Sequence, residues 1–139
     1  MFDSNDPLRV EYLDGRKWRL LEPFSYFDPT FRYDDDDPGV SGEFIDVPAG
    51  FTTDFASIPR AFWTVLPPTG EYGKAAVIHD WLYYRGHVGV QPITRRYADR
   101  IFRQAMLELG VSAHRRWLMW SAVRTFAGFL WAKHRLVRP

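Results

Sequence analysis

The sequence predicts an α+β fold over residues 1–139, a single domain in which a small antiparallel sheet from the N-terminal half packs against three C-terminal helices. Two observations support this fold class. Up to about residue 50, short apolar segments alternate with turn residues, which is typical of strands. Beyond residue 70, apolar residues recur at helical spacing. A chain of 139 residues can bury about two-thirds of its unfolded surface, so one domain is sufficient.

The first predicted elements form a β-hairpin. Residues 8–13 (LRVEYL) and 17–21 (KWRLL) flank the turn pair Asp14-Gly15, which is a strong hairpin signal between apolar segments. A third strand is predicted over residues 43–48 (EFIDVP), which end in a proline that cannot donate to a sheet.

Residues 33–39 (YDDDDPG) are predicted to form a solvated loop, because four consecutive aspartates repel one another. Calcium binding by this loop is an alternative, since Ca2+ takes oxygen ligands, but the alternating spacing of an EF-hand loop is absent. Residues 50–63 (GFTTDFASIPRAFW) contain Gly50 and Pro59, so they are not expected to form one continuous element.

Helices are predicted to dominate the second half. The first covers residues 73–84, and the second begins after the capping residue Thr94 and runs to about Leu109, where Gly110 stops it. The core-facing stripe of the second helix consists of Ala98, Ile101, Phe102, Ala105, Met106 and Leu109.

The third helix is expected to run from the capping residue Ser112 to about His134, and it is rich in Trp and Arg. Its uncharged apolar runs are far shorter than the ~20 residues needed to cross a bilayer, so no transmembrane segment is expected. Peripheral contact with a membrane surface, through basic flanks and Trp anchors, is one alternative. A core helix whose arginines extend to solvent is the preferred interpretation.

The composition excludes some classes of protein. A net charge of +1 argues against a general nucleic-acid binder. The absence of cysteine excludes disulfides and thiolate metal sites, and it agrees with a reducing compartment. The first residues lack a basic segment followed by an apolar run, so no secretory signal is expected.

Candidate chemistry centres on His79 and Asp80, which stand side by side in AAVIHDWLYY. On a helical wheel His79 shares the apolar face of its helix, whereas Asp80 points about a quarter-turn away. Asp99 lies at the edge of the apolar stripe on the second helix. Antiparallel packing of the two helices would bring Asp99 against His79. A carboxylate that accepts from one imidazole nitrogen leaves the other nitrogen as a general base.

The pattern His79-Asp80-x-x-Tyr83, followed by Asp99 on a second helix, resembles the active-site helices of phospholipase A2. The resemblance implies that His79 activates water, that Asp99 orients the reaction and that Tyr83 hydrogen-bonds to Asp99. It also implies that Asp80 holds Ca2+, which polarises an ester carbonyl. The Gly- and Cys-rich calcium loop and the disulfides of that family are absent from this sequence.

Three blocks, residues 46–63, 70–84 and 98–106, look like a family of phage and prophage proteins, a domain of unknown function. That family is recognised by a Gly-Phe-x-Thr-Asp-x-Ala-Ser-x-Pro-Arg block followed by His-Asp-x-Leu-Tyr. The resemblance implies a viral or prophage origin and brings no activity with it. It favours synthesis in the bacterial cytoplasm, association with a virion, and phage structural proteins or the host envelope as partners.

The first of these blocks gathers oxygen-bearing side chains at Thr53, Asp54 and Ser57, shortly before Arg60. One interpretation is a turn in which these side chains bond to neighbouring amides. The other makes Asp54 a cation ligand or a second carboxylate beside His79. Arg60 then pairs with an aspartate or binds a phosphate or carboxylate of a ligand.

The leading hypothesis is a phage-encoded hydrolase of an envelope lipid ester or a cell-wall bond, using a His79–Asp99 dyad and a divalent cation near Asp80. The alternative is a non-enzymatic virion, assembly or host-interaction protein, in which the His-Asp-Asp cluster is a buried network. An enzyme requires the second nitrogen of His79 to open on a cleft. Of the other histidines, His87 is an alternative metal ligand, and His114 and His134 are predicted to be surface residues.

Overall fold

The computed structural model describes all residues except 4–5, 16, 33–40, 55–71 and 138–139. In chain order, its elements are β1 (Val10–Asp14), β2 (Lys17–Leu20), β3 (Phe24–Arg32), β4 (Ser41–Val47), β5 (Thr52–Thr53), α1 (Gly73–Arg85), β6 (His87–Val88), β7 (Gln91–Pro92), α2 (Arg95–Glu108), α3 (Ala113–Phe126) and α4 (Gly128–Val137).

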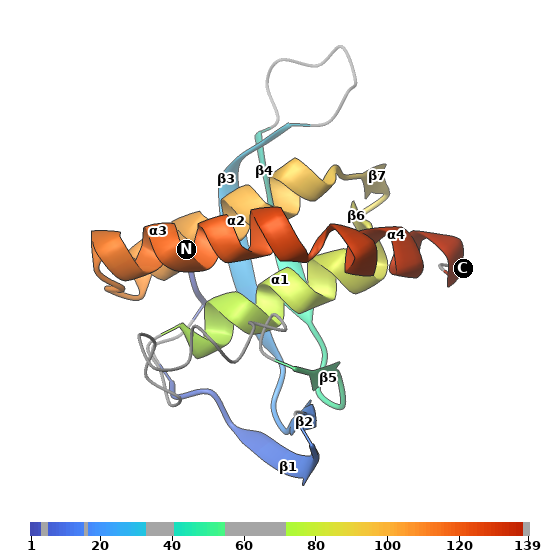
Figure 1. Cartoon of the computed structure of the whole chain (residues 1–139). Coiled ribbons are helices and arrows are strands. Elements are labelled where there is room, and N and C mark those ends of the chain that lie inside the picture. The colour runs from blue at the N-terminus through green and yellow to red at the C-terminus, as the bar shows by residue number, and fades with distance from the viewer. Residues whose placement is uncertain (4–5, 16, 33–40, 55–71, 138–139) are drawn as a thin grey trace.

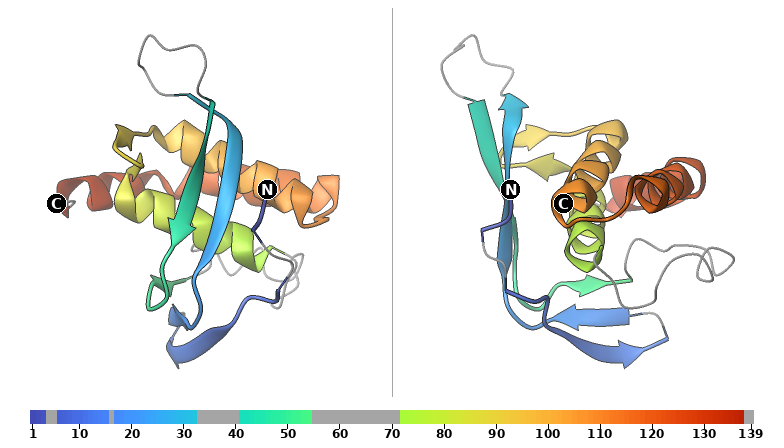
Figure 2. Two further views of the ribbon diagram at one scale, coloured as in Figure 1. Left: turned by 180° about the vertical axis from the view of Figure 1, so that it is seen from behind. Right: turned by 90° about the vertical axis from the view of Figure 1, so that its left-hand side faces the viewer.

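The elements stack in three layers. The antiparallel pair β3 and β4 lies on one side, α1 and α2 pack against it, and α3 and α4 form the layer farthest from it (Figure 2). β1, β2 and β5 form a second antiparallel sheet at the lower end of the molecule (Figure 1). This arrangement confirms the α+β class. None of the helices that the structure describes has the length and apolarity needed to cross a bilayer.

The predicted hairpin is confirmed, because β1 and β2 are antiparallel with Tyr12 opposite Trp18. Gly15, in the turn, has a φ of 54°, a value that glycine adopts without strain. β5 pairs with the other edge of β2, where Thr53 lies opposite Trp18. This pairing fixes Thr53 between the hairpin and the helices.

β3 was not among the strands predicted individually, because it contains Asp28 and Pro29, two residue types that are depleted in strands. The structure tolerates the buried Asp28 carboxylate because hydroxyl groups satisfy it. Thr30 donates to it at 2.7 Å and Tyr97, on α2, donates at 2.8 Å. Tyr26 supplies the apolar contribution of this strand to the core and is fully buried.

α1 and α2 match their predicted bounds, and α2 runs antiparallel to α1 (Figure 1). Thr94 caps α2 by accepting a hydrogen bond from the amide of Tyr97 at 3.1 Å. The predicted stripe faces α1, and its fully buried members are Ala98, Ile101, Phe102, Ala105 and Met106. Both helices therefore present polar residues of the candidate site to the same buried interface.

The third predicted helix is two helices, so its expected continuity from Ser112 to His134 is wrong. α3 ends at Phe126 and α4 begins at Gly128. The guanidinium of Arg95, on α2, donates to the backbone carbonyls of Val123 and Arg124, which lie in the last turns of α3. The carbonyl of Val123 also accepts its helical bond from the amide of Ala127 at 3.1 Å, so the guanidinium contacts α3 at the point where its ladder ends. Gly128, the first residue of α4, lies beside the same guanidinium, and a Cβ there would be in van der Waals contact with the guanidinium carbon at 3.4 Å.

α3 belongs to the core along one side only. Met119, Ala122 and Val123 are buried on the side that faces α2, whereas the indole of Trp117 is 60% exposed. The preferred interpretation of this segment as a core helix is therefore correct for its inner side only. Its outer side carries large apolar groups that no described element covers.

Candidate functional site

His79 lies in the middle of α1 and is 1% exposed. Its Nε2 is 2.7 Å from Oδ1 of Asp99, as the antiparallel packing of the two helices predicted. Ala75 and Ala76, one turn earlier on α1, are fully buried. The imidazole stacks between Tyr83 and Phe102, with ring centroids 4.2 Å and 4.9 Å away. The ring is therefore fixed by two aromatic neighbours as well as by the carboxylate.

Asp99 is fully buried and collects donors from three elements. Besides His79, the hydroxyl of Tyr83 donates to Oδ1 at 2.7 Å, and the guanidinium of Arg124, from α3, donates to Oδ2 at 2.8 Å. Burial raises the pKa of Asp99, but the hydrogen bond and charge of His79, with the donors Tyr83 and Arg124, outweigh it and lower the pKa. Asp99 is therefore ionised at neutral pH, so the Nε2 of His79 carries a proton.

Tyr83 connects the carboxylate to a second cation. Its hydroxyl donates to Asp99 and accepts from Nε of Arg95 at 3.1 Å. Burial raises the pKa of Tyr83, and the negative charge of Asp99 raises it further. Tyr83 therefore stays a protonated donor and does not itself supply a nucleophile or a base.

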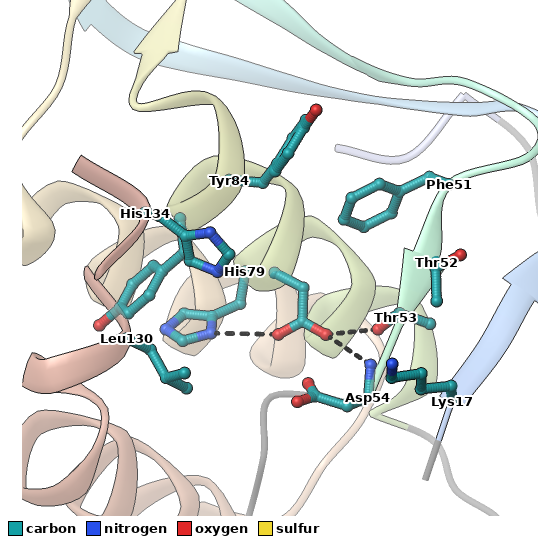
Figure 3. Close-up of a pocket in the computed structure, with 11 residues that line it drawn as sticks. Lys17, Phe51, Thr52, Thr53, Asp54, His79, Tyr84, Leu130 and His134 are labelled. Atoms are coloured by element: carbon teal, nitrogen blue, oxygen red, sulfur yellow. Dashed lines mark hydrogen bonds and ion pairs between the residues drawn. The ribbon is translucent and has the colours of Figure 1, made fainter. Parts of the chain in front are cut away.

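Asp80 ties α1 to β5. Its Oδ2 accepts from the hydroxyl of Thr53 and from the backbone amide of Asp54, the latter at 3.2 Å (Figure 3). Its Oδ1 lies 3.9 Å from Nδ1 of His79, which is an ion-pair distance and too long for a hydrogen bond. Burial raises the pKa of Asp80, but the neighbouring His79 and the donors from β5 outweigh it and lower the pKa.

The second nitrogen of His79 is the central feature of the site. Among the described residues, Nδ1 is the buried side-chain atom that lacks a hydrogen-bond partner. Burial lowers the pKa of His79, but the carboxylates of Asp80 and Asp99 outweigh it, so the pKa lies above its ordinary value. The protonated form of the imidazole is therefore more favoured than in a free histidine, and its Nδ1–H would be a donor without a partner among the described residues.

His79 reaches a pocket with a volume of about 180 Å³. Figure 3 shows that its walls come from β2, β5, α1 and α4. The residues that line it are Lys17, Phe51, Thr52, Thr53, Asp54, His79, Asp80, Tyr83, Tyr84, Leu130 and His134. One side of the pocket is polar and holds two carboxylates and a lysine, and the other side is aromatic and aliphatic.

The residues predicted for the site divide into two groups. The structure brings His79, Asp80, Tyr83 and Asp99 together with Thr53 and Asp54, as the sequence analysis expected. Ser57 and Arg60 lie outside the described residues, and so does the aspartate-rich segment 33–39.

Sequence reasoning missed several residues of the site. Arg124 was visible only as an isolated charge in an apolar stretch, and that isolation was the available signal. His134 was predicted to be a surface residue but lines the pocket from α4. Its ring lies edge-to-face with that of Tyr84, with the ring centroids 6.1 Å apart. Lys17 carried no distinguishing signal, because it lies in an ordinary hairpin strand.

The possible metal ligands of the described residues do not converge on a common point. Within the described ranges, no set of three or more His, Cys, Asp or Glu side chains is placed to hold a metal ion. Asp80, which was expected to be free for a cation, engages Thr53 and the amide of Asp54. His87 contacts the carbonyl oxygen of Gly89 at 2.8 Å and does not line the pocket.

Comparison with known proteins gives a family without an assigned activity. The family described as "Protein of unknown function (DUF1353)" matches residues 18–123. "Uncharacterized protein y4jT" of Sinorhizobium fredii is 33% identical over 107 residues, which cover 76% of this chain and 30% of that protein. The chain therefore spans less than a third of the length of that relative. No solved structure matches the chain. The extent of the family match includes both helices of the dyad, and the chain belongs to the DUF1353 family.

Proposed function

We propose that this chain is a hydrolase in which His79 is the general base. The observation that carries the proposal is that the two ring nitrogens of His79 have different surroundings. Its Nε2 is anchored to the buried Asp99 at 2.7 Å, whereas Nδ1 has no hydrogen-bond partner among the described residues and belongs to a side chain that lines the pocket. This is the division of roles that a general base needs, with one nitrogen fixing the tautomer and the other meeting the reactant.

The reaction is a hydrolysis in two proton transfers. Nδ1 of a neutral His79 takes a proton from a water molecule in the pocket while the water oxygen attacks the carbonyl carbon of an ester. Asp99 stabilises the imidazolium that forms. When the tetrahedral intermediate collapses, the C–O bond of the ester breaks and the leaving alkoxide takes the proton from Nδ1. The products are a carboxylic acid and an alcohol, and His79 returns to its starting state.

The surrounding residues support these steps without entering them. Tyr83 and Arg124 donate to Asp99, so the carboxylate stays ionised and correctly oriented. Lys17 lines the same pocket and provides a positive charge for the oxyanion of the intermediate. The apolar wall formed by Phe51 and Leu130 fits the acyl side of an ester.

The size of the pocket limits what it can hold. Its volume of about 180 Å³ is below the roughly 300–1,000 Å³ typical of sites that enclose a small organic ligand. It accommodates the reacting end of a larger molecule, with the remainder outside. This favours an ester of an envelope lipid or a bond of the cell wall as the substrate. A phage or prophage origin, which the sequence pattern favours, would give such an activity a use during entry or release.

A divalent cation has no step in this mechanism, because Asp80 already accepts from Thr53 and from the amide of Asp54. The expected role of Asp80 and Asp54 as Ca2+ ligands stays a prediction. Two carboxylates without further protein ligands would hold a cation weakly. Hydrolysis measured with Ca2+ and with a chelator tests it directly.

The decisive experiment compares release of fatty acid from phospholipid mixed micelles, and of nitrophenol from a short-chain ester, by wild type, His79→Gln and His114→Gln. The glutamine amide introduced by His79→Gln retains a donor for Asp99 but cannot serve as a base. We expect His79→Gln to reduce the rate by 10²-fold or more, the usual contribution of a general base, and the exposed His114→Gln to retain full activity. Equal rates for wild type and a folded His79→Gln variant would exclude the hydrolase.

A non-enzymatic role in a phage particle or its assembly is the second candidate. It is favoured by the burial of His79, which is 1% exposed. In that case the cluster holds α1, α2 and α3 in register. His79→Gln would then change the stability of the protein and leave no activity to lose.

A further inference from the structure

The outer layer of the molecule exposes large apolar side chains along its whole length. Trp117 on α3 is 60% exposed, and Phe129 and Leu136 on α4 are 68% and 87% exposed. α3 and α4 follow one another across the front of the molecule, on the far side of α1 and α2 from β3 and β4 (Figures 1 and 2). No described element packs over this side, so these groups face solvent.

These exposed groups belong to one stripe. Positions separated by three or four residues share a side of a helix, and α4 continues nearly in line with α3 (Figure 1). The stripe defined in this way, called the outer face below, consists of Trp117, Ser121, Thr125, Phe129, Ala132 and Leu136. It contains no charged residue, although a quarter of the chain is charged.

The same helices carry a one-sided charge. Residues 109–139 contain six of the 18 lysines and arginines and none of the 17 aspartates and glutamates. Arg115, Lys133 and Arg135 are exposed beside the outer face. The rest of the chain is correspondingly acidic, so the overall charge of +1 conceals a strong asymmetry.

A second pocket opens next to the outer face, between α2 and α3. It has a volume of about 530 Å³, and the described residues that line it are Arg100, Arg103, Gln104, Leu107, Ala113, Arg116 and Trp117. None of these is acidic. All three guanidinium groups have contacts that orient them. Arg103 stacks 5.4 Å from the ring of Trp120, and Arg116 donates to the carbonyl of Val111 at 2.9 Å. Arg100 stacks 5.3 Å from the ring of Tyr97 and lies 4.0 Å from the carboxylate of Asp28. Fixed guanidinium groups are good partners for a phosphate.

We propose that the outer face docks onto an anionic phospholipid bilayer, with a lipid phosphate in the arginine-lined pocket. The apolar stripe with a Trp and a Phe enters the interfacial region, and the flanking cations meet the anionic headgroups. The charge of residues 109–139 favours an anionic bilayer over a protein as the partner. A protein partner of average composition would not require a segment without any acidic residue. The inference does not depend on the proposed hydrolysis, although docking would bring lipid esters to the molecule.

The test is co-sedimentation of the full chain with vesicles of phosphatidylcholine and with vesicles of an equimolar mixture of phosphatidylcholine and phosphatidylglycerol. We expect binding to the anionic vesicles that weakens with added salt, and much weaker binding to the neutral ones. Equal binding to both vesicle types, or to neither, overturns the proposal.

Variants locate the surface. A Trp117→Ser, Phe129→Ser double variant should lose at least tenfold in partitioning, whereas Phe44→Ser, which removes a half-exposed ring from β4 in the opposite layer, should bind as wild type does. Lys133→Gln with Arg135→Gln should lose about 25-fold, at about fivefold per cation near an anionic surface. Arg103→Gln should lose about fivefold through the pocket, and Arg9→Gln, at an exposed position before β1, should lose nothing.

Two further outcomes separate competing explanations. Circular dichroism and melting curves establish that each variant is folded. His79→Gln should bind vesicles as wild type does, so a failed hydrolysis assay and a failed docking assay remain distinguishable. If sedimentation velocity shows a dimer that the Trp117→Ser, Phe129→Ser variant abolishes, with no vesicle binding by wild type, the face belongs to a second copy and the lipid proposal is wrong.

Discussion

The raised pKa of His79 predicts how the stability of the protein depends on pH. Because the folded-state pKa lies above its ordinary value of 6.5, the folded protein retains a proton that the unfolded chain has lost. The stabilisation is therefore complete below pH 6.5 and is lost as the pH rises through the folded-state pKa. Over that interval one proton is released on unfolding. The free energy of unfolding should fall by up to about 1.4 kcal/mol per pH unit.

The measurement is urea unfolding of wild type, His79→Gln and His114→Gln at closely spaced pH values between 5 and 9. The difference between wild type and His79→Gln should be constant below pH 6.5 and should shrink above it with the slope just given. His114, exposed near the start of α3, serves as the control, and its replacement should leave the wild-type slope intact. A wild-type profile parallel to that of His79→Gln over the whole range would refute the placement of the imidazole between Asp80 and Asp99.

Three other outcomes follow from the network. Arg124→Gln removes a charged donor 2.8 Å from the buried Asp99 and should lower the free energy of unfolding by about 2 kcal/mol in urea titrations, with Arg115→Gln on the exposed side as a neutral control. Thr53→Val leaves Asp80 without its hydroxyl donor and should cost about 1–2 kcal/mol; an unchanged unfolding midpoint would argue against that contact. The rate of hydrolysis should rise with pH through the raised pKa of His79, because only the neutral imidazole accepts a proton, and a rate that falls over this range would contradict the assignment of a base.

Much of the fold follows from local patterns. α2 was predictable because its apolar stripe, its cap at Thr94 and the stop at Gly110 agree with one another. The hairpin was predictable from Asp14-Gly15. The contact between His79 and Asp99 was predictable because His79 lies on the apolar face of α1 and Asp99 lies at the edge of the stripe on α2, so antiparallel packing could bring them together.

The remaining features depend on contacts between residues that are distant in the sequence. Arg124 reaches Asp99 across 25 positions, and no local pattern specifies which arginine of a Trp-rich helix turns inward. The strand β3 forms despite its internal proline because β4 and the helices stabilise it. α3 ends where Arg95, on another helix, contacts its last carbonyls. Helical periodicity does not reveal such a contact, so it predicted that the helix would continue.

The break between α3 and α4 lies at a contact that connects the end of α3 to the buried network. The guanidinium of Arg95 simultaneously holds the hydroxyl of Tyr83, in the buried network, and the terminal carbonyls of α3. The direction in which α4 departs sets the positions of Leu130 and His134 in the pocket wall. The side chain of Arg95 thus connects the buried network around Asp99 to the end of α3, from which α4 continues. A replacement of Arg95 is therefore expected to disturb both the hydrogen bonds of Tyr83 and the end of α3 that precedes the pocket residues of α4.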